Sequence, residues 1–192
     1  KGEVLSSEPI KGTAPRLKDK VKDDLLKEAL LKDPKERAEN VMIVDLVRND
    51  LSKVAKKGTV RVDELFGIYS FETVHQMISK ISCEPIDGIS LVDVLKATFP
   101  MGSMTGAPKL KAMELIEHYE DFKRGIYSGS IGYITPEGDF DFNVVIRSLL
   151  YNNIKKTMSC AVGGAITIQS DAEKEYEECL TKVQKILEGM NE

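Results

Sequence analysis

Apolar residues recur at helical spacing in several stretches of the chain. Between Lys18 and Leu31 they lie three to four positions apart, which predicts an amphipathic helix. Asp33 can cap a second helix and Pro34 fits its first turn, so this helix is expected to run to about Val54. Further helices are expected at residues 90–98, 108–119 and 172–189.

Alternating apolar and polar residues predict strands between these helices. From Thr73 to Cys83 the alternation places four side chains on one face: His75, Met77, Ser79 and Ile81. Other strands are expected at residues 59–62, 66–71, 127–135, 140–151 and 156–162, with a short one ending at Gln169. Helix pairs mixed with antiparallel hairpins indicate an α+β fold.

Length and composition exclude several classes of protein. The 192 residues, 42% of them hydrophobic, are enough for one large or two small domains. Lys and Arg total 27 against 31 Asp and Glu, and there is no long basic run, so nucleic acid is not expected as a partner. No apolar run reaches the roughly 18 residues of a membrane span. The three cysteines are far apart, which favours reduced thiols and a cytoplasmic location.

The segment from Pro9 to Arg16 is expected to form a turn around one lysine, Lys11. Gly12 gives the backbone conformational freedom there, and Thr13 and Arg16 add a hydroxyl and a guanidinium that can bind an anion. A surface turn with a solvated lysine is the alternative for this segment taken alone.

Two expected helices each carry a pair of glutamates three residues apart: Glu36 with Glu39, and Glu175 with Glu178. Each pair lies on one helix face. Taken singly, such pairs are ordinary surface residues. If the fold brings all four carboxylates together, they would require a hard cation, and Mg²⁺ is the natural occupant.

Three more residues are candidates for chemistry. His75 is either a half-buried structural histidine or a general acid. Arg147 lies in an apolar stretch expected to be a strand, so we expect its guanidinium to face an acid or a bound anion. Tyr127 either contacts the same anion or belongs to the core.

Five blocks of sequence together resemble one family over nearly the whole chain. They are Pro-Ile-Lys-Gly-Thr at 9–13, Glu-Arg-Ala-Glu-Asn-Val-Met-Ile-Val-Asp-Leu-Val-Arg-Asn-Asp at 36–50, Met-Gly-Ser-Met-Thr-Gly-Ala-Pro-Lys at 101–109, Ile-Arg-Ser at 146–148 and Glu-Tyr-Glu-Glu at 175–178. The chain resembles the chorismate-utilising enzymes, most closely their aminodeoxychorismate synthase branch. This resemblance implies the anthranilate synthase-like fold, with large antiparallel sheets flanked by helices.

The resemblance also implies roles for individual residues. Glu36, Glu39, Glu175 and Glu178 match the family's Mg²⁺ cluster, with Glu39 and Glu178 as direct ligands. The positions that match substrate contacts are Gly12, Thr13, Tyr127, Arg147, Gly164, Ala165 and Lys182. His75 matches the residue near the departing 4-hydroxyl of chorismate.

Lys11 distinguishes between reactions within the family. By the resemblance, anthranilate synthases have alanine there and ammonia attacks C2 of the ring directly. In the para-aminobenzoate branch the lysine attacks C2, the C4 hydroxyl leaves, and ammonia from a glutamine amidotransferase partner then enters at C4. The expected product is 4-amino-4-deoxychorismate.

Two questions stay open at this point. We expect residues 1–192 to be the C-terminal portion of one chorismate-binding catalytic domain, because the family has further N-terminal sequence before the Pro-Ile-Lys block. Besides the aminodeoxychorismate reaction, the sequence allows an anthranilate or isochorismate synthase, or a chorismate-binding fragment without turnover.

Overall fold

The computed structural model describes residues 3–168 and 170–189 of the chain, which divides into two compact units, 1–121 and 122–192. Each unit is described by itself. Helices and antiparallel sheets occur in both, which confirms the expected α+β class. The single catalytic domain expected over residues 1–192 stays a prediction.

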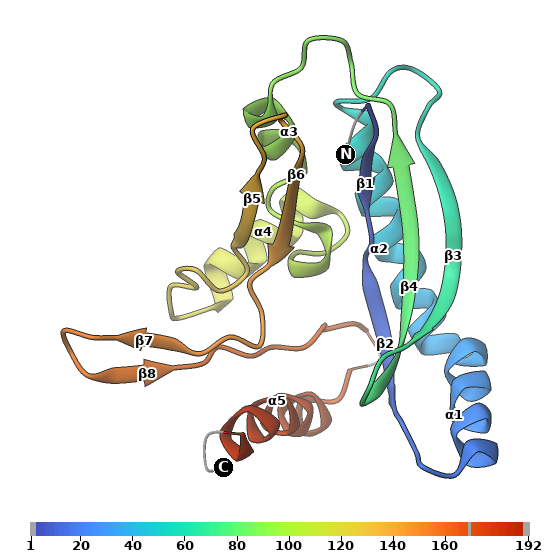
Figure 1. The fold of residues 1–192 in the computed structure, drawn as a ribbon. Helices are drawn as coiled ribbons and strands as arrows, with labels where there is room; N and C mark the ends of the chain where they lie inside the picture. Colours follow the sequence, from blue (N-terminus) through green and yellow to red (C-terminus); the bar gives the residue numbers. More distant parts are fainter. Residues whose placement is uncertain (1–2, 169, 190–192) are drawn as a thin grey trace. The chain divides into compact units, whose positions relative to one another are not determined.

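A four-stranded antiparallel sheet forms the centre of the first unit (Figure 1). Its strands are β1 (Leu5–Ser7), β2 (Ile10–Pro15), β3 (Arg61–Ser70) and β4 (Val74–Cys83). Strand β4 pairs with β3 along one edge, and with β1 and then β2 along the other. The four side chains expected on one face of β4 are all buried: His75, Met77, Ser79 and Ile81.

Lys11 lies within a strand, so the expected turn is wrong. The pairing of β2 with β4 shifts between Ile10 and Thr13, and Gly12 has a φ of 91°. A bulge of this kind needs a residue that tolerates positive φ, which is why glycine follows the lysine. Likewise, the two strands expected at 59–62 and 66–71 form one strand, β3, whose register shifts before Gly67.

Helices cover the face of the sheet that carries His75. They include α1 (Lys20–Lys32) and α2 (Pro34–Ser52), and the Asp33 carboxylate accepts hydrogen bonds from the first turn of α2, as expected. Val44 and Leu51 of α2 form a core with Ile81 of β4. Burial of such side chains drives the helix onto the sheet.

The remainder of the first unit follows β4 and contains α3 (Leu91–Thr98), the short 3-10 helix η1 (Gly102–Met104) and α4 (Lys109–Tyr119). Lys109 pairs with the buried Asp50 of α2 and also donates to the carbonyl oxygen of Pro100, 2.7 Å away. The loop between α3 and α4 is therefore fastened to the end of α2.

The second unit consists of two hairpins and a helix. Strands β5 (Ser130–Ile134) and β6 (Phe140–Val144) form one hairpin, β7 (Leu150–Asn152) and β8 (Thr157–Ser159) the other, and α5 spans Ala172–Glu188. The strand expected over 140–151 is interrupted, and no strand forms over 163–168; Gln169 lies outside the described residues. In the part of the chain that the structure describes, no helix is both long and apolar enough to span a bilayer.

Candidate functional site

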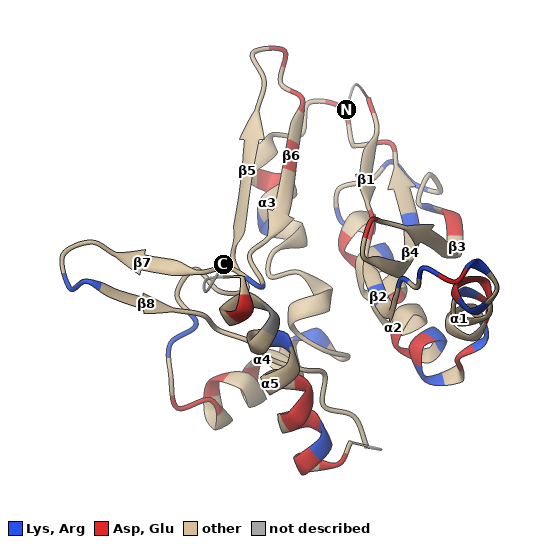
Figure 2. Ribbon diagram, turned by 60° about the horizontal axis from the view of Figure 1, so that its bottom comes forward, with Lys and Arg blue, Asp and Glu red and all other residues tan. Residues whose placement is uncertain are grey.

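The bulge in β2 directs Lys11 at helix α2. Its ammonium Nζ lies 2.6 Å from Oε2 of Glu39, and both side chains are largely shielded from solvent, at 25% and 12% exposure. A bulge changes the direction of a side chain relative to its strand, which accounts for a lysine that faces a helix here. Figure 2 shows acidic and basic residues along α2.

Glu36 lies one helical turn before Glu39 and beside the backbone of Gly12. A Cβ atom on Gly12 would be 3.3 Å from Oε2 of Glu36 and 3.1 Å from Cδ1 of Leu30. Burial raises the pKa of the Glu36 carboxyl, and the neighbouring Glu39 adds to this, while Lys11 opposes it. Two crowded carboxylates beside one ammonium form a site that favours a further positive charge.

His75 is buried on β4 and both ring nitrogens have partners. Nε2 lies 3.0 Å from Oδ1 of Asp23 on α1, and Nδ1 lies 2.8 Å from Oγ of Ser70 on β3. Arg16, which the sequence suggested as an anion ligand, forms an ion pair with Asp23 at 3.0 Å. Thr13 is exposed, so its expected substrate contact stays a prediction.

Expected site residues also gather within the second unit, around the Gly163-Gly164 pair. A Cβ on Gly163 would lie 2.9 Å from the Tyr127 hydroxyl, and one on Gly164 would lie 3.0 Å from Oε2 of Glu175. Only glycine leaves room for both groups. The pair therefore lets a hydroxyl and a carboxylate approach one stretch of backbone.

Helix α5 supplies the other expected residues of this group. Lys182 Nζ donates to the Gly163 carbonyl oxygen at 2.9 Å and pairs with Glu178 at 2.6 Å. Ser170, which sequence reasoning missed, donates to Glu175 Oε1 at 2.8 Å and lies 3.5 Å from the carbonyl oxygen of Ala165. Its position just before Asp171, the N-cap residue of α5, was the sequence signal for this role.

Arg147 corrects a sequence expectation. It is exposed, has a φ of 50°, and lies between β6 and β7 rather than inside a strand. Its apolar neighbours in the sequence therefore do not form a strand around it. Its role in binding an anion stays a prediction that rests on the family resemblance.

The four glutamates are divided between the two units, Glu36 and Glu39 in the first and Glu175 and Glu178 in the second. Among the described residues, no group of three or more His, Cys, Asp or Glu side chains is arranged to hold a metal ion. The donor chemistry fits Mg²⁺, which prefers carboxylate oxygens. Burial, and then the neighbouring Glu39, raise the pKa of the Glu36 carboxyl.

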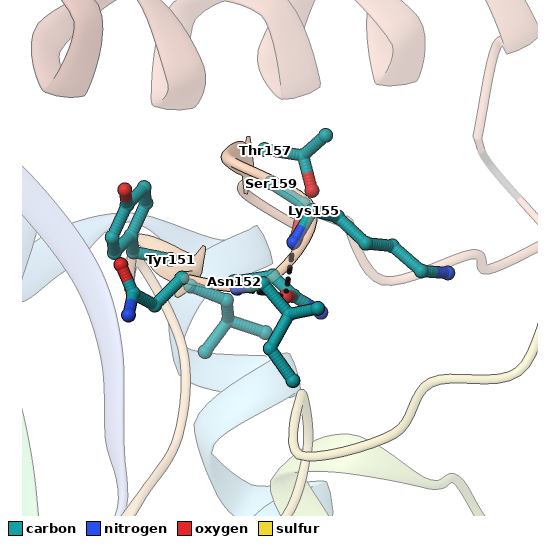
Figure 3. A pocket seen from close by; sticks show the side chains of 8 residues that line it. Tyr151, Asn152, Lys155, Thr157 and Ser159 are labelled. Carbon is teal, nitrogen blue, oxygen red and sulfur yellow. Dashed lines mark hydrogen bonds between the residues drawn. The ribbon is translucent and has the colours of Figure 1, made fainter.

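A separate hollow lies on the β7–β8 hairpin and is shown in Figure 3. Asn152 shapes it, because its Oδ1 accepts hydrogen bonds from the backbone N–H groups of Ile154 and Lys155 at 3.0 and 2.9 Å. None of the expected site residues lines it. It is the hollow of a hairpin turn and is not counted as part of the candidate site.

Asp23 is a further residue that sequence reasoning missed. The expected apolar face of α1 included Val21 and Leu25, but these are 71% and 60% exposed, whereas Asp23 and Leu30 are buried. Asp23 lies seven positions before Leu30 and so shares its face. An acidic residue on the same helix face as Leu30 was the sequence signal that Asp23 would be buried.

Comparison with known proteins agrees with this arrangement. Residues 1–188 match the family of chorismate binding enzymes. The chain is 43% identical over 183 residues to aminodeoxychorismate synthase component 1 of Klebsiella aerogenes, covering 95% of this chain and 40% of that protein. It is 44% identical over 181 residues to the chloroplastic aminodeoxychorismate synthase of Arabidopsis thaliana, covering 94% and 20%.

Anthranilate synthases are also similar. Component 1 from Aquifex aeolicus is 41% identical over 186 residues, covering 97% of this chain and 37% of that protein. The crystal structure of component I from Streptococcus pneumoniae TIGR4 superposes with a TM-score of 0.80 at 33% identity, covering 95% and 39%. The chain thus spans about 40% of the length of these bacterial relatives. With a family match over nearly its whole length, the chain belongs to the chorismate binding enzymes.

Proposed function

We propose that the protein containing this chain is an aminodeoxychorismate synthase component 1, which converts chorismate and ammonia to 4-amino-4-deoxychorismate for para-aminobenzoate and folate synthesis. The observation that carries the proposal is Lys11, an amine placed by a backbone bulge against the acidic face of α2. Bacterial relatives named aminodeoxychorismate synthase component 1 and plant relatives named aminodeoxychorismate synthase or probable aminodeoxychorismate synthase, at 41 to 45% identity, support it.

The reaction assigns one nucleophile to this chain. An ammonium has no lone pair, so Lys11 must separate from Glu39 and lose a proton before it attacks. Its Nζ then bonds to C2 of the ring while the double bonds shift and the C4–O bond breaks. The departing oxygen takes a proton, which the family resemblance assigns to His75, and leaves as water. Ammonia bonds to C4, the C2–N bond breaks, and Lys11 is regenerated.

Mg²⁺ is part of the proposal. Glu36, Glu39, Glu175 and Glu178 would hold it, with Glu39 and Glu178 as direct ligands. An ion bound there would supply positive charge for the ring carboxylate of chorismate. Gly12, Thr13, Tyr127, Arg147, Gly164, Ala165 and Lys182 would contact the substrate through backbone N–H groups and polar side chains. The ammonia would come from a glutamine amidotransferase subunit, as the name component 1 suggests for the bacterial relatives.

Anthranilate synthase is the second candidate, because relatives of that name are nearly as similar. Lys11 separates the two functions. The test is intact-protein mass spectrometry of the full-length protein with chorismate and Mg²⁺ but without ammonia, followed by peptide mapping. We expect an adduct of chorismate less one water on the peptide that contains Lys11.

Lys11→Ala provides the kinetic control, with Lys18→Ala, another lysine of the same β2–α1 region, as the matched variant. Lys11→Ala should reduce 4-amino-4-deoxychorismate formation by about 10²-fold or more, since covalent catalysis is lost, while Lys18→Ala should not. Bound chorismate without an adduct would favour direct attack by ammonia and reopen the choice between the two reactions. An unchanged rate and product in Lys11→Ala would show that Lys11 is not the nucleophile.

A further inference from the structure

A lysine ammonium lies against each of the two glutamates expected to bind Mg²⁺ directly. Lys11 Nζ is 2.6 Å from Oε2 of Glu39, and Lys182 Nζ is 2.6 Å from Oε1 of Glu178. The first pair forms within the first unit and the second pair within the second unit. Each candidate metal ligand is therefore already paired with a positive charge from the chain itself.

The Lys11–Glu39 pair is the better shielded of the two. Lys11 exposes 25% of its side chain and Glu39 exposes 12%. The Glu36 carboxylate, one helical turn before Glu39, lies beside Gly12 and so close to the same lysine. Attraction between shielded charges is weakened less by water and salt than attraction on the surface. A metal ion that binds Glu39 must therefore compete with a positive charge that is already close by.

The Lys182–Glu178 pair lies against the Gly163-Gly164 backbone. Lys182 also donates to the Gly163 carbonyl oxygen at 2.9 Å, and a Cβ on Gly164 would lie 4.0 Å from the Glu178 oxygen that contacts the lysine. The Glu178 side chain is 47% exposed, so water and salt screen this pair more than the first.

We infer that Lys11 and Lys182 compete with Mg²⁺ for their glutamate partners, so that binding of the metal releases both lysines. This inference rests on the proposed function for the identity of the metal. A divalent cation and an ammonium on one carboxylate repel each other, and the neutralised carboxylate holds the ammonium less tightly. The proposed reaction requires such a release, because Lys11 must separate from Glu39 before it attacks. Thermodynamic linkage makes the effect reciprocal, so removal of either lysine charge must tighten the binding of Mg²⁺.

The first measurement is the affinity of the full-length protein for Mg²⁺ without chorismate, by isothermal titration calorimetry. Lys11→Met and Lys182→Met each remove the charge and keep much of the side-chain volume. We expect the Kd to fall by about tenfold in Lys11→Met and by about threefold in Lys182→Met, whose ion pair is more exposed. Lys11→Arg keeps the positive charge and should not tighten binding. If Lys11→Met does not fold, Lys11→Gln is measured with the same expectation.

Lys32→Met is the matched control. Lys32 pairs with Glu28 at the same distance of 2.6 Å and with the same spacing of four residues as the pair on α5, but Glu28 is not an expected metal ligand. Its Kd for Mg²⁺ should equal that of the wild type. Equal tightening in Lys32→Met would reveal a general effect of net charge and refute the competition. An unchanged or weaker affinity in both Lys11→Met and Lys182→Met would also refute it.

Urea unfolding then separates competition from a purely structural ion pair. In EDTA we expect Lys11→Met to be less stable than the wild type, because Glu36 and Glu39 lose the positive charge beside them. At saturating Mg²⁺ this difference should shrink by the factor measured in Kd, because Lys11 is then no longer paired with Glu39. The same loss of stability with and without Mg²⁺ would show that the ion pair persists in the metal-bound protein, and would overturn the inference.

Failure of the proposed function would look different. Wild-type protein that forms no amino product from chorismate would refute the proposed reaction, but the Mg²⁺ titrations contain no chorismate and would still test the competition. Wild-type protein that binds no Mg²⁺ would refute the proposed metal site and this inference together.

Discussion

Gly12→Ala tests how the backbone beside Lys11 creates the site. Gly12 has a φ of 91°, a conformation that costs an L-residue roughly 1–2 kcal/mol. The added methyl group would also lie 3.1 Å from Cδ1 of Leu30 and 3.3 Å from Oε2 of Glu36. Overpacking of this kind typically costs about 1–3 kcal/mol. The two terms together predict a loss of roughly 2–5 kcal/mol in the free energy of unfolding.

Gly58→Ala is the matched control. Gly58 belongs to the same unit and has a φ of 80°, but a Cβ placed there would have no atom within 4 Å. It should therefore lose only the roughly 1–2 kcal/mol of backbone strain. Urea unfolding of the full-length protein, followed by circular dichroism, measures both variants, and turnover of chorismate is measured in parallel.

The expected result is that Gly12→Ala loses more stability than Gly58→Ala and also loses turnover, because the methyl group displaces Glu36. Equal losses of stability in the two variants would show that Leu30 and Glu36 do not confine this position. Wild-type turnover in Gly12→Ala would refute the view that Glu36 must lie against the β2 bulge.

Three further predictions concern buried or half-buried groups. Glu36→Gln should raise the free energy of unfolding, measured in EDTA at a pH above the raised folded-state pKa of Glu36, because the cost of ionising a half-buried carboxyl is removed. This gain should vanish below the ordinary carboxyl pKa, and unfolding at pH 7 and pH 3.5 measures it. Asp23→Asn should lower the free energy of unfolding at neutral pH, because the lowered pKa of the Asp23 carboxyl stabilises the fold there. The difference from wild type should shrink as the pH falls through the folded-state pKa, and a loss of stability that does not depend on pH would contradict this. Ile81→Ala, at a fully buried position, should cost about 2–5 kcal/mol by urea unfolding, whereas Ile131→Ala, at an exposed one, should cost little; similar costs would place the core elsewhere.

Local signals in the sequence predicted most of the helices and their boundaries. Asp33 and Pro34 act within one turn of α2, so their effect does not depend on the rest of the fold. The alternation along β4 was equally local, and it correctly placed His75 on the buried face. The strand boundaries around Arg147 were predicted less well, because an apolar run does not reveal where the backbone turns.

The sequence by itself also determined the family, since its blocks of motifs match the chorismate binding enzymes over residues 1–188. Only the tertiary structure decided that Lys11 lies on a bulge against Glu39, and that His75 is held between Asp23 and Ser70. These contacts join residues 5 to 52 positions apart, and they depend on strand register and on the rotation of each helix. Neither is encoded in a short stretch of sequence, because both are set by how whole elements pack.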